Sequence, residues 1–118
     1  MNGAGETLLK LLSVWNESDE GARAATLDEA LGASFVYEDP HAPEPFEGRE
    51  GMESYLSVFR ANLPDAVLLP MGQPRVTHGT AMARARLDRG GAPFADLIFV
   101  GTMGEDGLAR VAGFVEGE

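Results

Sequence analysis

The sequence predicts an α+β fold in which three N-terminal helices pack on a mostly antiparallel sheet. Apolar residues recur at spacings of three and four in the first half of the chain, which is typical of amphipathic helices. The second half contains alternating segments separated by glycine-rich turns, which is typical of strands joined by hairpins. A length of 118 residues fits a single domain over residues 1–118.

Three segments have the helical pattern. The first, residues 7–15, is only a few residues from the second, which should end near Gly32, so the two should pack as a hairpin. The third, residues 50–63, stops before Pro64. The apolar stripes of these helices are formed by Leu8, Leu11, Leu12 and Trp15, by Leu27, Ala30 and Leu31, and by Met52, Tyr55, Leu56 and Phe59.

Strands are expected to supply the rest of the fold. Gly90 and Gly91 mark a tight turn in the second half. The strand that follows this turn, residues 94–103, is apolar on both faces. One face should meet the helices and the other a second copy of the chain, which predicts a homodimer through the sheet face. The other expected strands are residues 35–37, an interrupted strand at 66–69 and 75–78, and residues 80–87 and 108–116.

Composition excludes several classes of partner. The formal net charge of −10 argues against nucleic acid and anionic membrane surfaces. The chain has no cysteine, and its acids and histidines lack metal-ligand spacing, so we expect no metal and no cofactor. No apolar run approaches the roughly 18 residues that cross a membrane, and the first residues lack the basic leader of a signal peptide. We therefore expect a cytoplasmic protein.

Residues 37–51, YEDPHAPEPFEGREG, form a proline-rich crossing between a strand and the third helix. Such a crossing in a small chain is usually functional or covers something. Asp39 stands directly before Pro40, which favours an extended conformation at Asp39. We expect this segment to line the mouth of a pocket.

The order of the elements and four short strings resemble the nuclear transport factor 2-like (NTF2-like) superfamily, in particular its SnoaL-like and ketosteroid-isomerase-like branches. The strings are Trp15-Asn16, YEDP at 37–40, EGRE at 47–50 and EDGLARVAGFVE at 105–116. The resemblance implies a cone-shaped α+β barrel with a pocket between a curved sheet and the helices, commonly in a dimer. It does not fix the activity, because one fold hosts many chemistries.

In ketosteroid-isomerase-like members the Asp of an EDP string is the general base, so the resemblance implies that role for Asp39. Those enzymes also place a Tyr and a protonated Asp around an enolate oxygen. Here Trp15 stands in the tyrosine's neighbourhood and Phe99 at the acidic position. Asp96 lies three residues before Phe99 and points to the opposite face of a regular strand, which disfavours steroid isomerisation.

Two histidines are candidate proton partners of Asp39, because histidine titrates near neutrality. His78 stands before Gly79 at a strand end, a pair that many SnoaL-like sequences share, and His41 follows Asp39 by two residues. Exposure at a strand end or in a loop is the alternative for each. Asp39 itself could instead cap local backbone before the proline.

The pocket wall is expected to be aromatic and apolar, which suits a small hydrophobic molecule. Arg84 could bind a carboxylate or enolate oxygen, or it could form a salt bridge with one of the 19 acids. Arg86 and Asp88 form an Arg-x-Asp pair like that of limonene-epoxide-hydrolase-like relatives, but the second Asp that such enzymes need is missing from the last strand. The expected wall residues are Trp15, Tyr55, Phe59, Met82, Arg84, Phe99 and Phe114.

Two functions stay open at this point. The first is a small-molecule-binding SnoaL-like protein that acts as an acid–base enzyme of isomerase, cyclase or hydratase type on a hydrophobic carbonyl compound. In it Asp39 takes a proton, and His78 or His41 supplies or stabilises one. The second is a non-catalytic ligand-binding or dimerisation module of the same fold.

Overall fold

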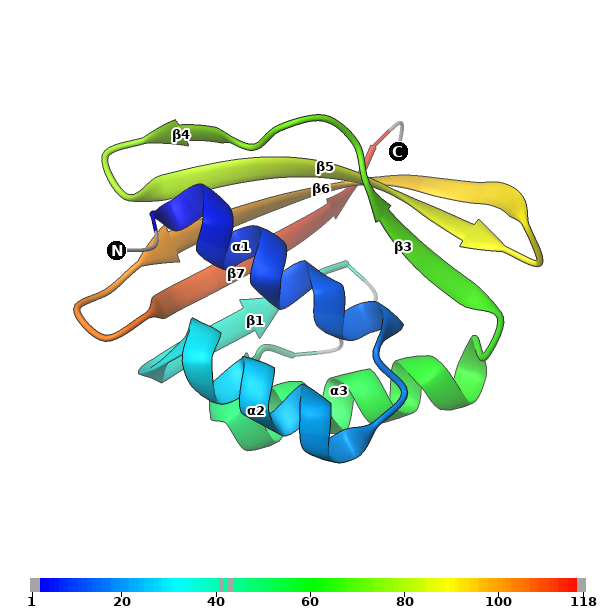
Figure 1. Ribbon diagram of the computed structural model, residues 1–118, viewed down its shortest axis with the longest axis horizontal. Coiled ribbons are helices and arrows are strands. Elements are labelled where there is room, and N and C mark those ends of the chain that lie inside the picture. The colour runs from blue at the N-terminus through cyan, green and yellow to red at the C-terminus, as the bar shows by residue number, and fades with distance from the viewer. Residues whose placement is uncertain (1–2, 41, 43, 117–118) are drawn as a thin grey trace.

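A computed structural model of the chain describes residues 3–40, 42 and 44–116. Two helices come first, two strands separate them from the third helix, and the other strands of the sheet follow (Figure 1). The helical elements are α1 (Ala4–Ser13), the 3₁₀ turn η1 (Val14–Asn16), α2 (Glu20–Ala30) and α3 (Gly48–Asn62). The strands are β1 (Leu31–Glu38), β2 (Phe46–Glu47), β3 (Ala66–Pro70), β4 (Arg75–Thr77), β5 (Thr80–Arg89), β6 (Ala92–Met103) and β7 (Leu108–Val115).

The helices begin and end where local chemistry dictates. The carboxylate of Asp19 accepts a hydrogen bond from the backbone N–H of Ala22 at 2.7 Å and so caps the start of α2. Helix α3 ends before Pro64, as expected. Helix α2 ends at Ala30, and Gly32, which the sequence marks as the stop, already lies in β1. A side chain at Gly32 would collide with Asp106, so close packing accounts for this glycine.

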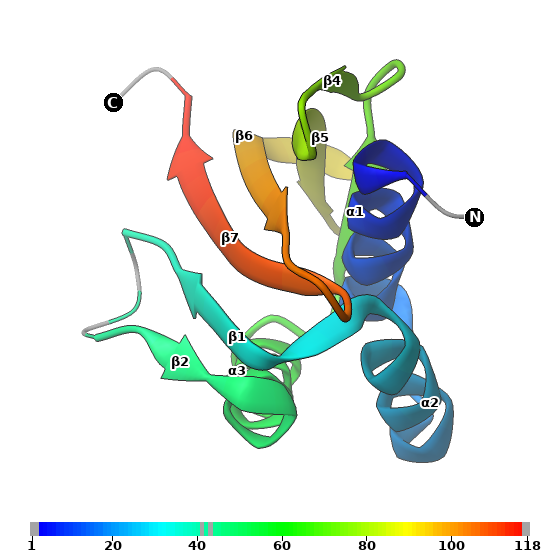
Figure 2. The same cartoon turned by 90° about the vertical axis from the view of Figure 1, so that its left-hand side faces the viewer.

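The sheet has the strand order β2-β1-β7-β6-β5-β3, and β4 also pairs with β5. All pairs are antiparallel except β1 with β7, which is parallel and was not expected. The two pieces of the interrupted strand, β3 and β4, both pair with β5. The α+β prediction is confirmed, but the sheet is curved and open, so it is not a closed barrel (Figure 2).

Helix α1 lies against the inner face of the curved sheet (Figure 2). The inward side chains of β5 include Ala81, Ala83 and Ala85, all almost completely buried, and their small size lets the helix approach closely. The residues that alternate with them, Met82 and Arg84, lie on the outer face of the sheet. The core is therefore a layer between the three helices and one face of the sheet.

The turn between β5 and β6 is formed by Gly90 and Gly91, whose φ angles are +58° and +82°. Residues with a side chain rarely adopt positive φ angles, which explains why two adjacent glycines stand at this turn. None of the helices in residues 3–40, 42 and 44–116 is long and apolar enough to cross a membrane. The cytoplasmic location stays a prediction.

Candidate functional site

A pocket of about 440 Å³ lies between α3, the segment that follows β1, and the inner faces of β6 and β7. Its wall is mainly apolar, as expected for a site that binds a hydrophobic molecule. The inner part of the wall carries six aromatic rings, which are those of Trp15, Tyr37, Phe46, Tyr55, Phe59 and Phe99.

Asp39 is the one charged side chain among the described residues that line this pocket. Its Oδ2 accepts hydrogen bonds from the hydroxyl of Tyr37 at 2.7 Å and from the hydroxyl of Tyr55 at 2.8 Å. Its Oδ1 accepts a hydrogen bond from the backbone N–H of Ala42 at 3.0 Å. The carboxylate is therefore held in a fixed position at the polar end of the pocket.

The rings around Asp39 pack edge-to-face and tilted rather than in parallel stacks. The centroid of Trp15 lies 5.8 Å from that of Tyr37, 6.0 Å from that of Tyr55 and 5.5 Å from that of Phe99. The rings of Tyr37 and Tyr55 are 4.9 Å apart. Such contacts add stability beyond the burial of the rings and leave little freedom to the two hydroxyls.

Both tyrosines stay protonated over a wide pH range. Burial raises the pKa of the Tyr37 hydroxyl well above its usual value, and the neighbouring Tyr55 and Asp39 raise it further. Burial also raises the pKa of Tyr55, Asp39 adds to the rise, and hydrogen bonds with Tyr37 and Trp15 only partly oppose it. At neutral pH each hydroxyl therefore carries the hydrogen that it donates to Asp39.

Gly113 on β7 leaves the space that the polar end needs. A Cβ atom at this position would lie 3.1 Å from the hydroxyl oxygen of Tyr37 and 3.2 Å from Cβ of Asp39. It would also lie 3.3 Å from the ring of Phe99. All three contacts are tighter than ordinary van der Waals separation, so a larger residue here would displace the carboxylate or the rings.

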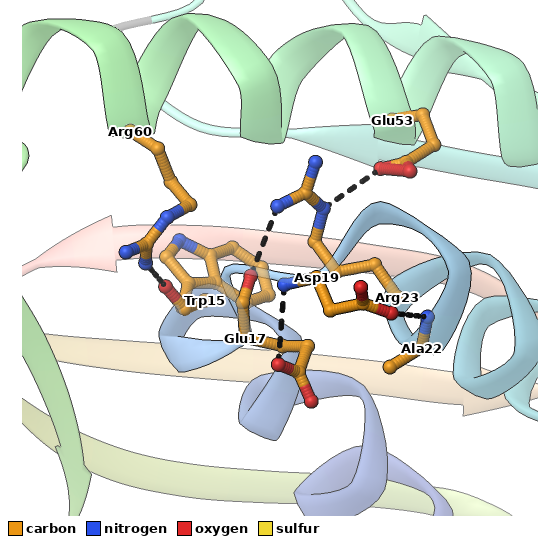
Figure 3. Close-up of polar contacts among 7 residues, drawn as sticks. All are labelled: Trp15, Glu17, Asp19, Ala22, Arg23, Glu53 and Arg60. Atoms are coloured by element: carbon orange, nitrogen blue, oxygen red, sulfur yellow. Dashed lines mark hydrogen bonds and ion pairs between the residues drawn. The ribbon is translucent and has the colours of Figure 1, made fainter.

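Polar bonds from three elements hold the backbone around Trp15. Arg60 of α3 donates a hydrogen bond to the carbonyl oxygen of Trp15 at 2.8 Å (Figure 3). The buried Arg23 of α2 donates to the carbonyl oxygen of Glu17 at 2.9 Å and pairs with Glu53 at 3.2 Å (Figure 3). Asn16 completes the set, because its amide exchanges two 2.8 Å hydrogen bonds with the backbone of Leu68. These bonds fix the backbone of Trp15 and of the two residues that follow it, and so they hold the indole ring in place.

The structure brings most of the expected wall residues to the pocket, namely Trp15, Tyr55, Phe59, Phe99 and Phe114. Phe114 is half exposed and belongs to the rim. Met82 and Arg84 are not among the lining residues, because their strand turns them to the outer face. Arg84 forms an ion pair with Glu116, which is the second of the two roles considered for it.

The structure shows the position of one of the two expected proton partners of Asp39. His78 is exposed in the turn between β4 and β5, with a φ of +45°, and does not line the pocket. His41 lies outside the described residues. Arg86 pairs with Asp88 through two bonds of 2.7 and 3.1 Å, and neither residue lines the pocket. In the described part of the chain, no group of three or more acids and histidines could hold a metal ion.

Tyr37 is the site residue that the sequence reasoning missed, and Tyr55 was expected only as a wall residue. The signal for Tyr37 was present, because Tyr37 and Asp39 are two residues apart and side chains at that spacing leave a strand on the same face. Of the positions compared with the isomerase pattern, Phe99 lines the pocket and Asp96 lies opposite the outward-facing Arg86.

The fold also occurs in solved structures. A candidate isomerase of the SnoaL-like family from Agrobacterium tumefaciens superposes with a TM-score of 0.86 at 24% identity, covering 94% of this chain and 95% of that one. The fold of this chain is NTF2-like. A candidate polyketide cyclase from Sinorhizobium meliloti superposes with a TM-score of 0.71 at 18% identity, covering 91% and 92% of the two chains.

A likeness in fold does not fix an activity. A de novo designed protein with a curved β-sheet superposes with a TM-score of 0.74 at 9% identity, covering 97% of this chain and 85% of that one. No protein-family model and no curated protein matches the chain by sequence. The function must therefore be argued from the pocket itself.

Proposed function

We propose that the chain binds a small hydrophobic carbonyl compound in this pocket and that Asp39 exchanges a proton with the carbon next to the carbonyl group. The observation that carries the proposal is the position of Asp39. Its carboxylate faces an aromatic pocket of about 440 Å³ and is held by Tyr37 and Tyr55. A fixed base beside an apolar cavity is the arrangement that proton abstraction needs.

The proposed step moves one proton and one negative charge. A carboxylate oxygen of Asp39 takes the proton from the substrate carbon, the C–H electrons form a carbon–carbon double bond, and the carbonyl electrons move to oxygen. Return of the proton to another carbon completes an isomerisation. Attack of the enolate carbon on a second carbonyl of the same molecule gives an alkoxide, and transfer of the proton from Asp39 to this alkoxide completes a cyclisation. Both outcomes begin with the same enolate.

The tyrosines offer a way to stabilise that enolate. While Asp39 is charged, both hydroxyl hydrogens point at its Oδ2. Once Asp39 has taken the proton, it becomes a weaker acceptor and the charge lies on the substrate oxygen. The hydroxyl hydrogen of a tyrosine can turn about the C–O bond while the ring stays in place, so Tyr55 can then donate to the enolate. This supplies a donor at a site where Phe99 provides none.

Proton exchange in D₂O tests the proposal without knowledge of the natural substrate. Incorporation of deuterium next to the carbonyl of 1-phenylbutane-1,3-dione and of related aryl ketones is followed by NMR with wild-type protein and with Asp39→Asn. We expect the variant to lose on the order of a hundredfold or more in exchange rate, the usual contribution of a positioned base. Equal rates in both proteins would contradict the assignment of Asp39.

A non-catalytic binding module is the second candidate function. It is favoured by the observation that the described hydroxyl donors at the polar end, those of Tyr37 and Tyr55, are both directed at Asp39. In that case wild-type protein binds the ketones without exchanging their protons. Asp39→Asn then changes the affinity but no rate.

We also propose that the chain forms a homodimer through the outer face of the sheet. Apolar side chains gather there on adjacent strands, where Val100 lies between Met82 on β5 and Ala112 on β7. The neighbouring Ile98 continues the row between Arg84 on β5 and Phe114 on β7, and Arg84 forms an ion pair with Glu116. A second copy of the same face would cover this row.

A further inference from the structure

The last residues of β7 have one paired edge and one edge that no described strand covers. On one side β7 pairs with β6 as far as Val115, and the backbone N–H of Glu116 still donates to the carbonyl oxygen of Asp96 at 2.8 Å. On the other side, pairing with β1 ends at Ala112 in the described part of the chain, and Figure 2 shows the ends of the two strands lying apart. The edge at 113–115 is therefore open toward the segment that follows β1.

A proline accounts for the end of the pairing between β1 and β7. In a regular parallel ladder, the next bond would run from the backbone N–H of residue 40 to the carbonyl oxygen of Gly113. Residue 40 is a proline and has no backbone N–H. A turn begins here instead, in which the carbonyl oxygen of Asp39 accepts a hydrogen bond from the N–H of Ala42 at 3.2 Å. Pro40 therefore opens the edge of β7 beside Asp39.

The register of β6 and β7 determines which backbone groups face the open edge. Residues opposite each other in an antiparallel ladder alternate between pairs that exchange both hydrogen bonds and pairs that exchange none. Glu116 belongs to a pair of the first kind, because its N–H donates to β6. Val115, which lies opposite Leu97, therefore belongs to a pair of the second kind. Its N–H and C=O groups point away from β6 and toward the open edge.

Val115 lines the pocket together with Gly113 and Asp39. A Cβ atom at Gly113 would lie 3.2 Å from Cβ of Asp39, and Val115 follows Gly113 by two positions, or roughly 7 Å along the strand. A carbonyl compound can span this separation, with a hydrogen bond of about 2.9 Å at its oxygen and a contact of about 3.3 Å at the neighbouring carbon. The ladder bonds on either side of Val115 fix its N–H before a ligand binds.

We infer that the backbone N–H of Val115 donates a hydrogen bond to the carbonyl oxygen of the ligand. This deepens the proposed function, on which it rests, by naming a group that positions the substrate. The N–H of Val115 is in place while Asp39 is charged and the hydroxyls of Tyr37 and Tyr55 bond to it. It therefore binds the ketone before proton transfer and stays bonded to the oxygen as the enolate charge develops.

The substitution Val115→Pro removes this one donor. A proline is tolerated in a strand where the missing N–H would face an open edge, and the ladder bonds of the neighbouring residues remain. The matched ligands are butyrophenone and butylbenzene, which differ only in the replacement of C=O by CH₂, and their binding is measured by equilibrium dialysis. We expect Val115→Pro to weaken butyrophenone about threefold to tenfold more than butylbenzene, the usual net value of one neutral hydrogen bond.

Butylbenzene separates the lost hydrogen bond from a steric effect, because the proline ring occupies the same space beside both ligands. Val115→Ala is the control, since it shortens the side chain and keeps the N–H, so it should affect both ligands by the same factor. The α-hydroxy acid analogue of valine at position 115 has an ester oxygen in place of the N–H and repeats the test without a proline ring. Equal losses for the two ligands in the proline and ester proteins would overturn the inference.

The failure of this inference and that of the proposed function can be told apart. A selective loss of ketone binding in Val115→Pro, with equal deuterium exchange by wild-type protein and Asp39→Asn, supports the hydrogen bond and removes only the acid–base role. Loss of exchange in Asp39→Asn, with equal effects of Val115→Pro on butyrophenone and butylbenzene, removes only the contact with Val115.

Discussion

Tyr37 and Tyr55 donate hydrogen bonds to the same oxygen atom of Asp39, although one lies on β1 and the other on α3. The two bonds arise in different ways. Tyr37 and Asp39 are neighbours on one face of the chain, so their contact needs only local structure. Tyr55 reaches Asp39 only when α3 is docked on the sheet, so this second bond joins the helix layer to the site.

We expect Tyr37→Phe to lower the free energy of unfolding by about 1–3 kcal/mol, because the hydroxyl is buried and bonds to a carboxylate. Urea denaturation followed by circular dichroism measures the change. Tyr55→Phe, at a less buried position, should cost less. A Tyr37→Phe protein as stable as wild type would show that the bond to Asp39 contributes nothing to the fold.

Gly113→Ala should disturb the site, since the added methyl group meets Tyr37, Asp39 and Phe99 at 3.1–3.3 Å. We expect a loss of about 1–3 kcal/mol in the free energy of unfolding, together with weaker binding of phenyl ketones. Gly21→Ala is the control, because Gly21 lies exposed in α2 and alanine favours helices by up to about 1 kcal/mol. Unchanged ketone binding in Gly113→Ala would show that the neighbouring side chains can shift to make room for the methyl group without disturbing the pocket.

Arg60→Met should change the environment of Trp15, because it removes the hydrogen bond to the Trp15 carbonyl oxygen. The chain has one tryptophan, so its fluorescence spectrum reports on this residue alone. We expect a shift in emission and weaker ketone binding. Arg49→Met is the control, since Arg49 pairs with Asp28 at the surface and should leave the spectrum unchanged.

Alkaline pH should destabilise the fold through the two tyrosines. Their pKa values are raised in the folded state above the usual value of about 10 for tyrosine, so folded protein keeps the protons that unfolded protein releases. The free energy of unfolding is therefore unaffected below pH 10 and falls above it, by at most about 1.4 kcal/mol per pH unit and tyrosine.

The ultraviolet absorbance of tyrosinate checks this directly, because the chain contains only these two tyrosines. In folded protein the absorbance should not rise near pH 10, and in urea it should. Normal ionisation in the folded protein would show that the hydroxyls reach water.

Sedimentation at micromolar concentration should give a mass of about twice 12.5 kDa if the outer sheet face forms a dimer. Val100→Glu should produce monomers, because it places a charge in the centre of the apolar row. Val76→Glu serves as the control, because Val76 is exposed on β4 and pairs with the inward-facing Ala81. Monomers of wild-type protein would contradict the dimer.

The helices and the hairpins of this fold could be predicted because their signals are local. Gly90 and Gly91 identify a turn wherever they stand, and the alternation along β5 identifies a strand. Which face of β5 points inward is not a local property. Met82 and Arg84 were expected in the pocket, but the alanines beside them make room for α1.

The candidate site could be predicted only in part. The resemblance pointed to Asp39 and to an aromatic wall, and the structure places both at the pocket. The resemblance gave no role to Tyr37, because the hydrogen-bond donors to the enolate oxygen in ketosteroid-isomerase-like enzymes come from other elements of the fold. The position of His41 lies outside the described residues, so its role as a proton partner stays a prediction.

The parallel pairing of β1 with β7 joins strands that are far apart in the sequence. Closing so long a loop costs entropy before any contact repays it, so this pairing should be among the last to form during folding. Asp39 directly follows β1 and Gly113 lies in β7, which means that the polar end of the pocket exists only after the final strand has docked. Ligand binding would then require that β7 has been synthesised and has paired with β1. A chain that lacks β7 would have no binding pocket.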